Sequence, residues 1–123
     1  MTAHAELGRC GEDYTARWLE KNGYRIVERN WHSRWGEIDL IAENGEVLAF
    51  VEVKTRKAGN IGSPEEAVSA VKQQRILKTA EYYLLLHPTV LQPRFDAAAL
   101  VVSAEDEPQL AHFRYYESAF TGE

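Results

Sequence analysis

This sequence has a single cysteine, no closely spaced histidine pair and no long apolar run. The single Cys10 excludes an internal disulfide framework and a thiolate zinc site, and the four histidines are scattered without metal-ligand spacing. No hydrophobic run approaches the roughly 18 residues that a membrane-spanning helix needs. The segment from Met1 to Glu6 has neither a basic nor an apolar stretch of the kind found in export signals. We therefore expect a cytoplasmic protein with no membrane partner.

The remaining composition is that of an ordinary globular domain. The 123 residues are 45% hydrophobic and 27% charged, and no repeat or Pro/Gly/Ser-rich linker divides them. A chain of this length can bury about two thirds of its unfolded surface, which is enough for one core. Residues 1–123 are thus predicted to form a single domain.

The charge of the chain is unevenly distributed. Its 14 basic and 19 acidic residues give a net charge of −5, which argues weakly against a nucleic-acid partner. The stretch from Lys54 to Lys78, however, is basic, and the C-terminal segment is acidic. One part of the molecule can therefore face phosphate while the other keeps it soluble.

Sequence patterns predict an α/β fold with a sheet covered by helices. A first helix is expected over about 5–22, ending at Asn22-Gly23. A second begins at the capping box Ser63-Pro-Glu-Glu66, with an interruption allowed near Ser69, and ends before Pro88. Strands are expected at 24–30, on both sides of Asn44-Gly45, at 94–103 and at 109–116.

The dipeptide Asn44-Gly45 predicts a hairpin with a two-residue loop. That register pairs Glu43 with Glu46, Glu37 with Glu52 and Asp39 with Phe50. Because side chains alternate along a strand, one face then carries the charged residues and the other the apolar ones. The charged face holds Glu37, Asp39, Glu52 and Lys54, and the apolar face holds Ile38, Leu40, Val47, Ala49, Val51 and Val53.

Three carboxylates on one face of a hairpin need a source of positive charge. At about 5 Å and an effective dielectric of about 20, each pair repels by roughly 3 kcal/mol. Lys54 offsets only part of this repulsion, whereas a divalent cation can offset it fully. Oxygen ligands without histidine or thiolate suit Mg²⁺ or Mn²⁺, which can activate water against a phosphodiester. A surface ion-pair network is the alternative interpretation.

Asp39 followed on the next strand by Glu52-Val53-Lys54 resembles the PD-(D/E)xK nuclease signature, with Ile38 where proline usually stands. More closely, the chain resembles the YraN-like family of small bacterial proteins, described as predicted endonucleases and similar to archaeal Holliday-junction resolvases. The segments that carry the resemblance are Gly8-Arg-Cys-Gly-Glu12, Gly36-Glu-Ile-Asp-Leu-Ile41, Phe50-Val-Glu-Val-Lys-Thr-Arg56 and Arg94-Phe-Asp96.

The resemblance implies a restriction-endonuclease-like α-β-β-β-α-β core with a mixed central sheet. It implies that Asp39 and Glu52 bind the metal with the Val53 carbonyl, and that Lys54 positions the attacking water. Glu12, which shares a helical row with Ala16 and Leu19, resembles the resolvases' helical glutamate and would extend the metal site, although an exposed helix residue is equally plausible. Glu37 has no role in the superfamily motif. From the hairpin register, we expect it to support these ligands or to bind a second ion.

These observations lead to one favoured function and two alternatives. The favoured function is a Mg²⁺- or Mn²⁺-dependent endodeoxyribonuclease acting on branched or structured DNA, for which a homodimer would suit a two-fold junction. The first alternative is a catalytically inactive nucleic-acid-binding or assembly module. The second is a purely structural or protein-binding domain.

Side chains outside the motif have two interpretations each. The residues expected to contact phosphate are Arg56, Lys57, Lys72 and Arg75, with a solvated surface as the alternative. Trp31 and Trp35 can stack on an unpaired base, although packing at the core or its rim is favoured. Cys10 is expected to be buried.

Overall fold

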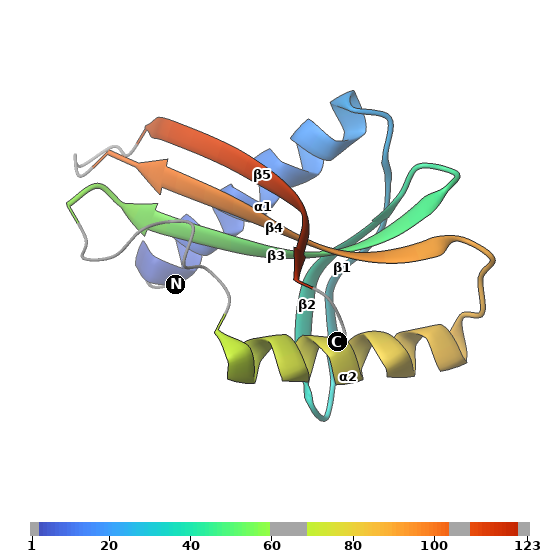
Figure 1. Cartoon of the computed structure of the whole chain (residues 1–123). Helices are drawn as coiled ribbons and strands as arrows, with labels where there is room; N and C mark the ends of the chain where they lie inside the picture. Colours follow the sequence, from blue (N-terminus) through green and yellow to red (C-terminus); the bar gives the residue numbers. More distant parts are fainter. Residues whose placement is uncertain (1–2, 60–68, 104–108, 121–123) are drawn as a thin grey trace.

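The computed structural model describes residues 3–59, 69–103 and 109–120, with side chains from residue 9 onward. Within these ranges, two helices and five strands follow the predicted order (Figure 1). They are α1 (Ala3–Lys21), β1 (Arg25–Ser33), β2 (Gly36–Glu43), β3 (Val47–Lys57), α2 (Ala70–Leu86), β4 (Gln92–Val102) and β5 (Leu110–Phe120).

The five strands form one mixed sheet in the order β1-β2-β3-β4-β5. Strands β3 and β4 are parallel and are connected through α2, while the other neighbouring pairs are antiparallel. The two helices lie on opposite faces of this sheet (Figure 1). The predicted α/β class, with an α-β-β-β-α-β core and a mixed sheet flanked by helices, is confirmed.

Each face of the sheet has its own hydrophobic core. Residues of α1 contribute to the α1-side core, which consists of Ala16, Leu19, Leu40, Ala42, Ala49, Val51, Ala98 and Leu100. Residues of α2 contribute to the α2-side core, which consists of Ile38, Ile41, Leu48, Phe50, Ile76, Ala80, Tyr83 and Phe120. Successive side chains of the central strand β3 enter the two cores alternately. The charged residues of β3, which begin at Glu52, follow the core positions and lie at the margin of the cores.

The described part of α2 begins at the predicted interruption. Ser69 is its N-cap, and the Ser69 hydroxyl accepts a hydrogen bond of 3.2 Å from the backbone N–H of Lys72. The predicted capping box at Ser63–Glu66 lies outside the described residues. Over the described ranges, neither helix combines the length and apolar character needed to cross a membrane.

The predicted two-residue hairpin loop is wrong. Glu43 pairs with Leu48 and Ile41 with Phe50, whereas the prediction placed Glu43 opposite Glu46 and Phe50 opposite Asp39. The side chain of Asn44 is the reason, because its oxygen accepts hydrogen bonds from the backbone N–H groups of residues 46 and 47 and closes a longer turn. Each β2 residue therefore pairs with a β3 residue two positions further along than predicted. Because side chains alternate with a period of two, this shift keeps them on their predicted faces, except where β2 itself is irregular.

Two predicted burials also differ from the structure. Ile38 packs in the α2-side core together with Ile41, not on the face of Leu40, so β2 loses its alternation between Ile38 and Leu40. The irregularity lies at Asp39, just beyond the last described pair of β2 with β3, Leu40–Val51. Cys10 is exposed rather than buried, because it lines an open hollow between α1 and the strands β4 and β5.

Candidate metal site in an acidic pocket

Asp39 lies where β2 and β3 stop pairing. Its Oδ2 atom accepts a hydrogen bond of 2.8 Å from the backbone N–H of Val53, which lies past the last described pair of the two strands. The Asp39 residue is half-buried. Burial, and secondarily the negative charge of Glu52, raise the pKa of Asp39 to about 8, and the Val53 N–H opposes part of that rise. The site therefore holds a carboxyl group that lacks enough positive charge to ionise readily.

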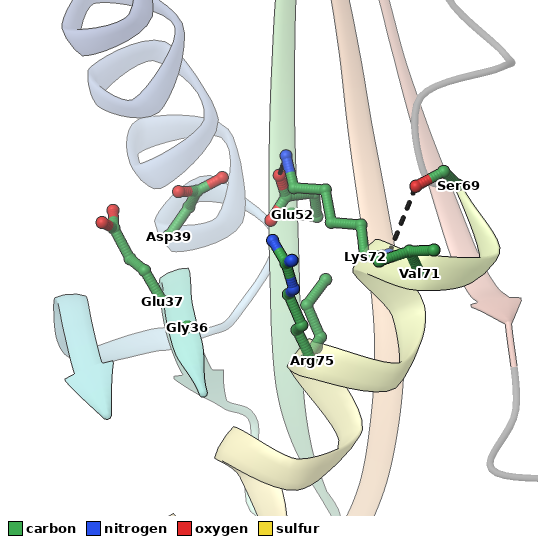
Figure 2. A pocket seen from close by; sticks show the side chains of 9 residues that line it. Gly36, Glu37, Asp39, Glu52, Ser69, Val71, Lys72 and Arg75 are labelled. Carbon is green, nitrogen blue, oxygen red and sulfur yellow. Dashed lines mark hydrogen bonds and ion pairs between the residues drawn. The ribbon is translucent and has the colours of Figure 1, made fainter. Parts of the chain in front are cut away.

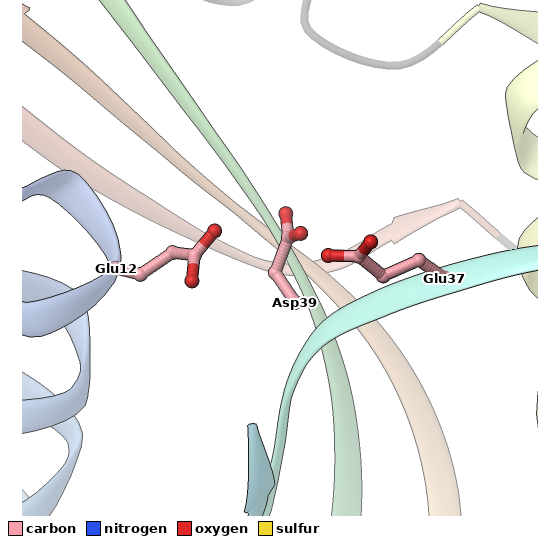
Figure 3. Close-up of side chains that lie close together, drawn as sticks. All are labelled: Glu12, Glu37 and Asp39. Carbon is pink, nitrogen blue, oxygen red and sulfur yellow. The ribbon is translucent and has the colours of Figure 1, made fainter. Parts of the chain in front are cut away.

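Three carboxyl groups from two elements converge at this point. One oxygen each of Glu12, Glu37 and Asp39 lies within 4.8 Å of the other two. Figure 3 shows Glu12 reaching in from α1 and Glu37 from the opposite side, with Asp39 between them. Burial raises the pKa of Glu12, and a hydrogen bond from the Asn30 side chain partly opposes this. The Glu37 side chain is 38% exposed and lies 3.4 Å from Nδ1 of His32.

Close packing of α1 on β3 brings Glu12 to the sheet. A Cβ atom added to Gly11 would lie 1.9 Å from Oγ1 of Thr55, so only glycine allows the helix this near. An ion pair of 2.5 Å between Asp13 and Arg29 joins the same helical turn to β1. These contacts on either side of Glu12 in the sequence fix its position, and the strong curvature of β2 in Figure 3 brings Asp39 toward it.

The cluster opens into a pocket of about 540 Å³ between β2, β3 and the first turns of α2. Figure 2 shows Lys72 and Arg75 pointing from α2 toward the carboxyl groups of the strands. Glu52 is only 4% exposed and forms an ion pair with the ammonium group of Lys72. The residues lining the pocket are Gly36, Glu37, Asp39, Glu52, Ser69, Val71, Lys72, Arg75 and Ile76. Carboxyl groups and cations therefore face each other across one solvent-accessible space.

The other predicted site residues lie further along β3. Lys54 and Arg56 follow Glu52 by two and four residues, so alternation puts them on the same face of the strand. Lys57 falls on the opposite face, apart from the pocket. In an extended strand, the N–H and C=O groups of one residue point to the same side of the strand. The Val53 N–H points toward Asp39 of β2, so we expect the Val53 carbonyl to point toward β2 as well. Of the four predicted phosphate contacts, Lys72 and Arg75 line the pocket described here.

Two features of the site are not predicted from the sequence. Asn30, whose side chain binds Glu12, has a positive φ of 51° within β1, a conformation that asparagine tolerates better than most residues. An asparagine in a predicted strand can indicate such a backbone irregularity. Lys72 was predicted to contact phosphate, yet its partner here is Glu52. Nothing in the local sequence links residues 20 positions apart on different elements.

The donor set of the cluster fits a hard divalent cation. All its side-chain ligands are carboxyl oxygens, the atoms that Mg²⁺ and Mn²⁺ prefer. A single ion binds such oxygens at about 2.1 Å, so ligands within 4.8 Å of one another can reach it after small side-chain rotations. A cation would also let Asp39 ionise, because it supplies the charge that the buried carboxyl lacks.

The fold and pocket define an α/β protein with an acidic site at the edge of two diverging strands. The family described as "Uncharacterised protein family UPF0102" matches residues 11–100, a range that includes all the pocket residues. The chain belongs to this family, as the resemblance to YraN-like proteins predicted. Similar UPF0102 proteins occur in Rhodococcus jostii (strain RHA1) and Anaeromyxobacter dehalogenans (strain 2CP-C). The first is 45% identical over 93% of this chain and 98% of the relative, and the second is 43% identical over 95% and 85%, respectively.

Proposed function

We propose that this protein is a metal-dependent endonuclease-like hydrolase that cleaves phosphodiester bonds in branched or structured DNA. The observation that carries the proposal is the convergence of Glu12, Glu37 and Asp39, with one oxygen each within 4.8 Å of the others, beside the buried Glu52. Such a cluster repels itself strongly unless a cation or protons neutralise it. A pocket that also presents Lys72 and Arg75 suits an anionic substrate.

In this proposal, Asp39 and Glu52 bind Mg²⁺ or Mn²⁺ with help from the Val53 carbonyl, and Glu12 and Glu37 complete or extend the site. When bound, the ion would polarise the phosphoryl oxygen and acidify a water molecule. Lys54 orients that water or stabilises the charge that develops on the phosphate. Arg75 and Arg56 attract the nucleic-acid backbone, and Lys72 does so once it has left Glu52. This division of roles follows the PD-(D/E)xK motif and the similarity to resolvases proposed from the sequence.

Calorimetric titration with Mn²⁺ in the absence of DNA tests whether the carboxyl groups form a site at all. We expect saturable binding by the wild type and at least about tenfold weaker binding by Asp39→Asn, which keeps the side-chain shape but loses the charge. Glu46→Gln removes the same charge from the exposed hairpin loop and should bind as the wild type does. Equal binding by all three proteins would exclude the proposed metal site.

A cleavage assay then tests the reaction. The protein is incubated with branched and linear DNA of equal length, with Mg²⁺, with Mn²⁺ and with EDTA. We expect metal-dependent cleavage, preferentially of the branched DNA, and its loss in both Asp39→Asn and Lys54→Ala. Cleavage that survives both substitutions would come from another site or from a contaminant.

One observation favours an inactive nucleic-acid-binding or assembly module instead. The ammonium group of Lys72 already neutralises Glu52, so part of the acidic pocket is stable without an ion. This alternative predicts that DNA binding is the same in EDTA and in Mg²⁺, that Asp39→Asn leaves it unchanged, and that no nicking occurs at any metal concentration. The cleavage assay above, together with a DNA-binding measurement on the wild type and Asp39→Asn in EDTA and in Mg²⁺, separates the alternatives.

A further inference from the structure

A second hollow, separate from the acidic pocket, lies at the β1–β2 turn. It has a volume of about 290 Å³ and is lined by Arg34, Trp35 and Tyr82. The rings of Trp35 and Tyr82 are 5.6 Å apart and meet edge to face, and the guanidinium group of Arg34 lies 4.6 Å from the centre of the Trp35 ring. We call these three residues the aromatic notch. Its size is close to the lower limit of small-molecule sites, about 300 Å³.

The notch lies at the rim of the α2-side core, next to Trp31. Trp31 packs against the α2-side core and makes an edge-to-face contact with Tyr83 at 5.0 Å. Trp35 is not among the side chains packed against either core of the described residues, and Tyr82 is 39% exposed. Tyr82 also contacts the Trp31 ring at 6.0 Å, and Trp35 is half-buried, so the two rings lie at the rim of the core with part of their surface open to solvent.

The notch adjoins the acidic pocket. Trp35 immediately precedes Gly36, which lines the pocket and packs beside Arg75 of α2. On α2 itself, Arg75 and Lys78 precede Tyr82 by seven and four residues, so the three lie along one side of the helix. Arg75 and Lys78 are both exposed. A row of positive charge therefore connects the pocket with the two rings.

We propose that the aromatic notch binds an unstacked nucleobase of a nucleic-acid strand whose backbone follows Arg75 and Lys78 into the acidic pocket. Every base has a π-face that stacks on aromatic rings regardless of sequence, and a guanidinium group adds a cation–π contact or binds the adjacent phosphate. The inference rests on the proposed function, because it supplies that site with a substrate that carries an unpaired nucleotide next to the bond to be cut. A branch point or a single-stranded gap provides such a nucleotide.

Tryptophan fluorescence in EDTA at low salt tests the notch independently of metal chemistry. The probes are a short oligothymidylate and an abasic strand of the same length, which has the same phosphates but no bases. For the wild type, we expect oligothymidylate to quench the fluorescence and to bind more tightly than the abasic strand. Trp35→Leu should weaken binding of oligothymidylate by about 5- to 100-fold and remove most of the quenching, while binding of the abasic strand stays unchanged.

Two control variants separate stacking from damage to the fold. Trp35→Tyr keeps a π-face and should retain most of the affinity. Trp18→Phe changes a ring on the opposite side of the sheet, where Trp18 stacks on Tyr115 at 4.7 Å, and should keep both affinity and quenching. Because the wild type is compared on two strands, the test remains decisive even if Trp35→Leu folds poorly.

Equal affinity of the wild type for the two strands, or unchanged base-dependent binding by Trp35→Leu, would overturn the notch and leave the proposed metal site intact. If the wild type bound bases but neither cleaved DNA nor bound Mn²⁺, the result would support base binding by the notch and contradict the nuclease proposal. If neither strand bound the wild type at low salt, the notch proposal would be wrong, whatever the metal titration gave.

Discussion

At the scale of single residues, Asp39 couples the stability of the protein to pH. Burial and the charge of Glu52 raise the pKa of Asp39 from 3.8 to about 8 in the folded protein. Between these values the folded state holds a proton that the unfolded chain has released, so the free energy of unfolding falls as pH rises from about 4 to about 8. Burial of Glu12 shifts its pKa in the same direction. The metal-free protein is therefore expected to be most stable in mild acid.

The variant Asp39→Asn should remove most of this dependence. Asparagine can still accept the hydrogen bond from the Val53 N–H but cannot ionise. We expect its free energy of unfolding in EDTA at about pH 8.5 to exceed that of the wild type by at least about 1 kcal/mol, the equivalent of less than one pKa unit. Urea denaturation at about pH 5.5 and pH 8.5 measures this. Glu46→Gln should follow the wild-type curve, and an equally steep curve for Asp39→Asn would contradict the assignment.

Lys72 is the counter-ion of a carboxylate that is almost fully buried. Lys72→Met keeps most of the length of the side chain but leaves the charge of Glu52 unpaired. We expect the free energy of unfolding in EDTA, measured by urea denaturation, to fall by about 1–3 kcal/mol. The double variant Lys72→Met/Glu52→Gln should recover most of the loss. If Glu52 is also a metal ligand, Mn²⁺ should stabilise Lys72→Met more than the wild type. A cation that stabilised the two proteins equally would show that Lys72 and the ion do not share Glu52.

At the scale of elements, the contact between α1 and β3 positions the acidic cluster. Gly11 permits the close approach to Thr55, and Glu12 is the next residue. Gly11→Ala should cost about 1–2 kcal/mol net, because overpacking outweighs the better helix propensity of alanine. It should also weaken Mn²⁺ binding, because the displaced helix carries Glu12 with it.

Gly45→Ala is the matched control for that substitution. Gly45 has a φ of +95°, and a Cβ atom there would meet nothing within 4 Å, so alanine costs about 1 kcal/mol through backbone strain alone. A similar loss of stability with unchanged Mn²⁺ affinity is expected, measured by urea denaturation and calorimetry. If both variants lost affinity equally, general destabilisation rather than movement of Glu12 would be the cause.

Periodicity predicted which elements form, while details of geometry depended on single side chains. Alternation along β3 correctly separates Val51 and Val53 from Glu52, because β3 stays regularly paired with β4 over its whole length. The predicted length of the hairpin loop is wrong, because the side chain of Asn44 closes a longer turn than the backbone preference of Asn-Gly suggests. The irregularity at Asp39 was equally invisible, because it arises where pairing with β3 ends.

At the scale of the whole molecule, the acidic site depends on contacts between distant parts of the chain. The sequence motif named Asp39, Glu52 and Lys54, and similarity of pattern suggested Glu12. The meeting of Glu12 with Glu37 required a helix from one face of the sheet to reach a strand that curves toward it (Figure 3). Such tertiary geometry cannot be obtained from periodicity, which describes each element separately.

The net negative charge of the chain opposes DNA binding, whereas the cations near the pocket favour it. The salt dependence of DNA affinity therefore reports how many of these cations contact phosphates. The chain carries −5 overall, so we expect weak association that depends on the few cations near the pocket. Each phosphate neutralised contributes about 0.9 to the slope of log affinity against log salt. Arg75→Gln should therefore lower the magnitude of that slope by about 1, measured by fluorescence anisotropy with labelled branched DNA in EDTA. Lys21→Gln, in the last turn of α1, should leave the slope unchanged. An identical slope for the wild type and Arg75→Gln would show that the backbone does not pass this side of α2.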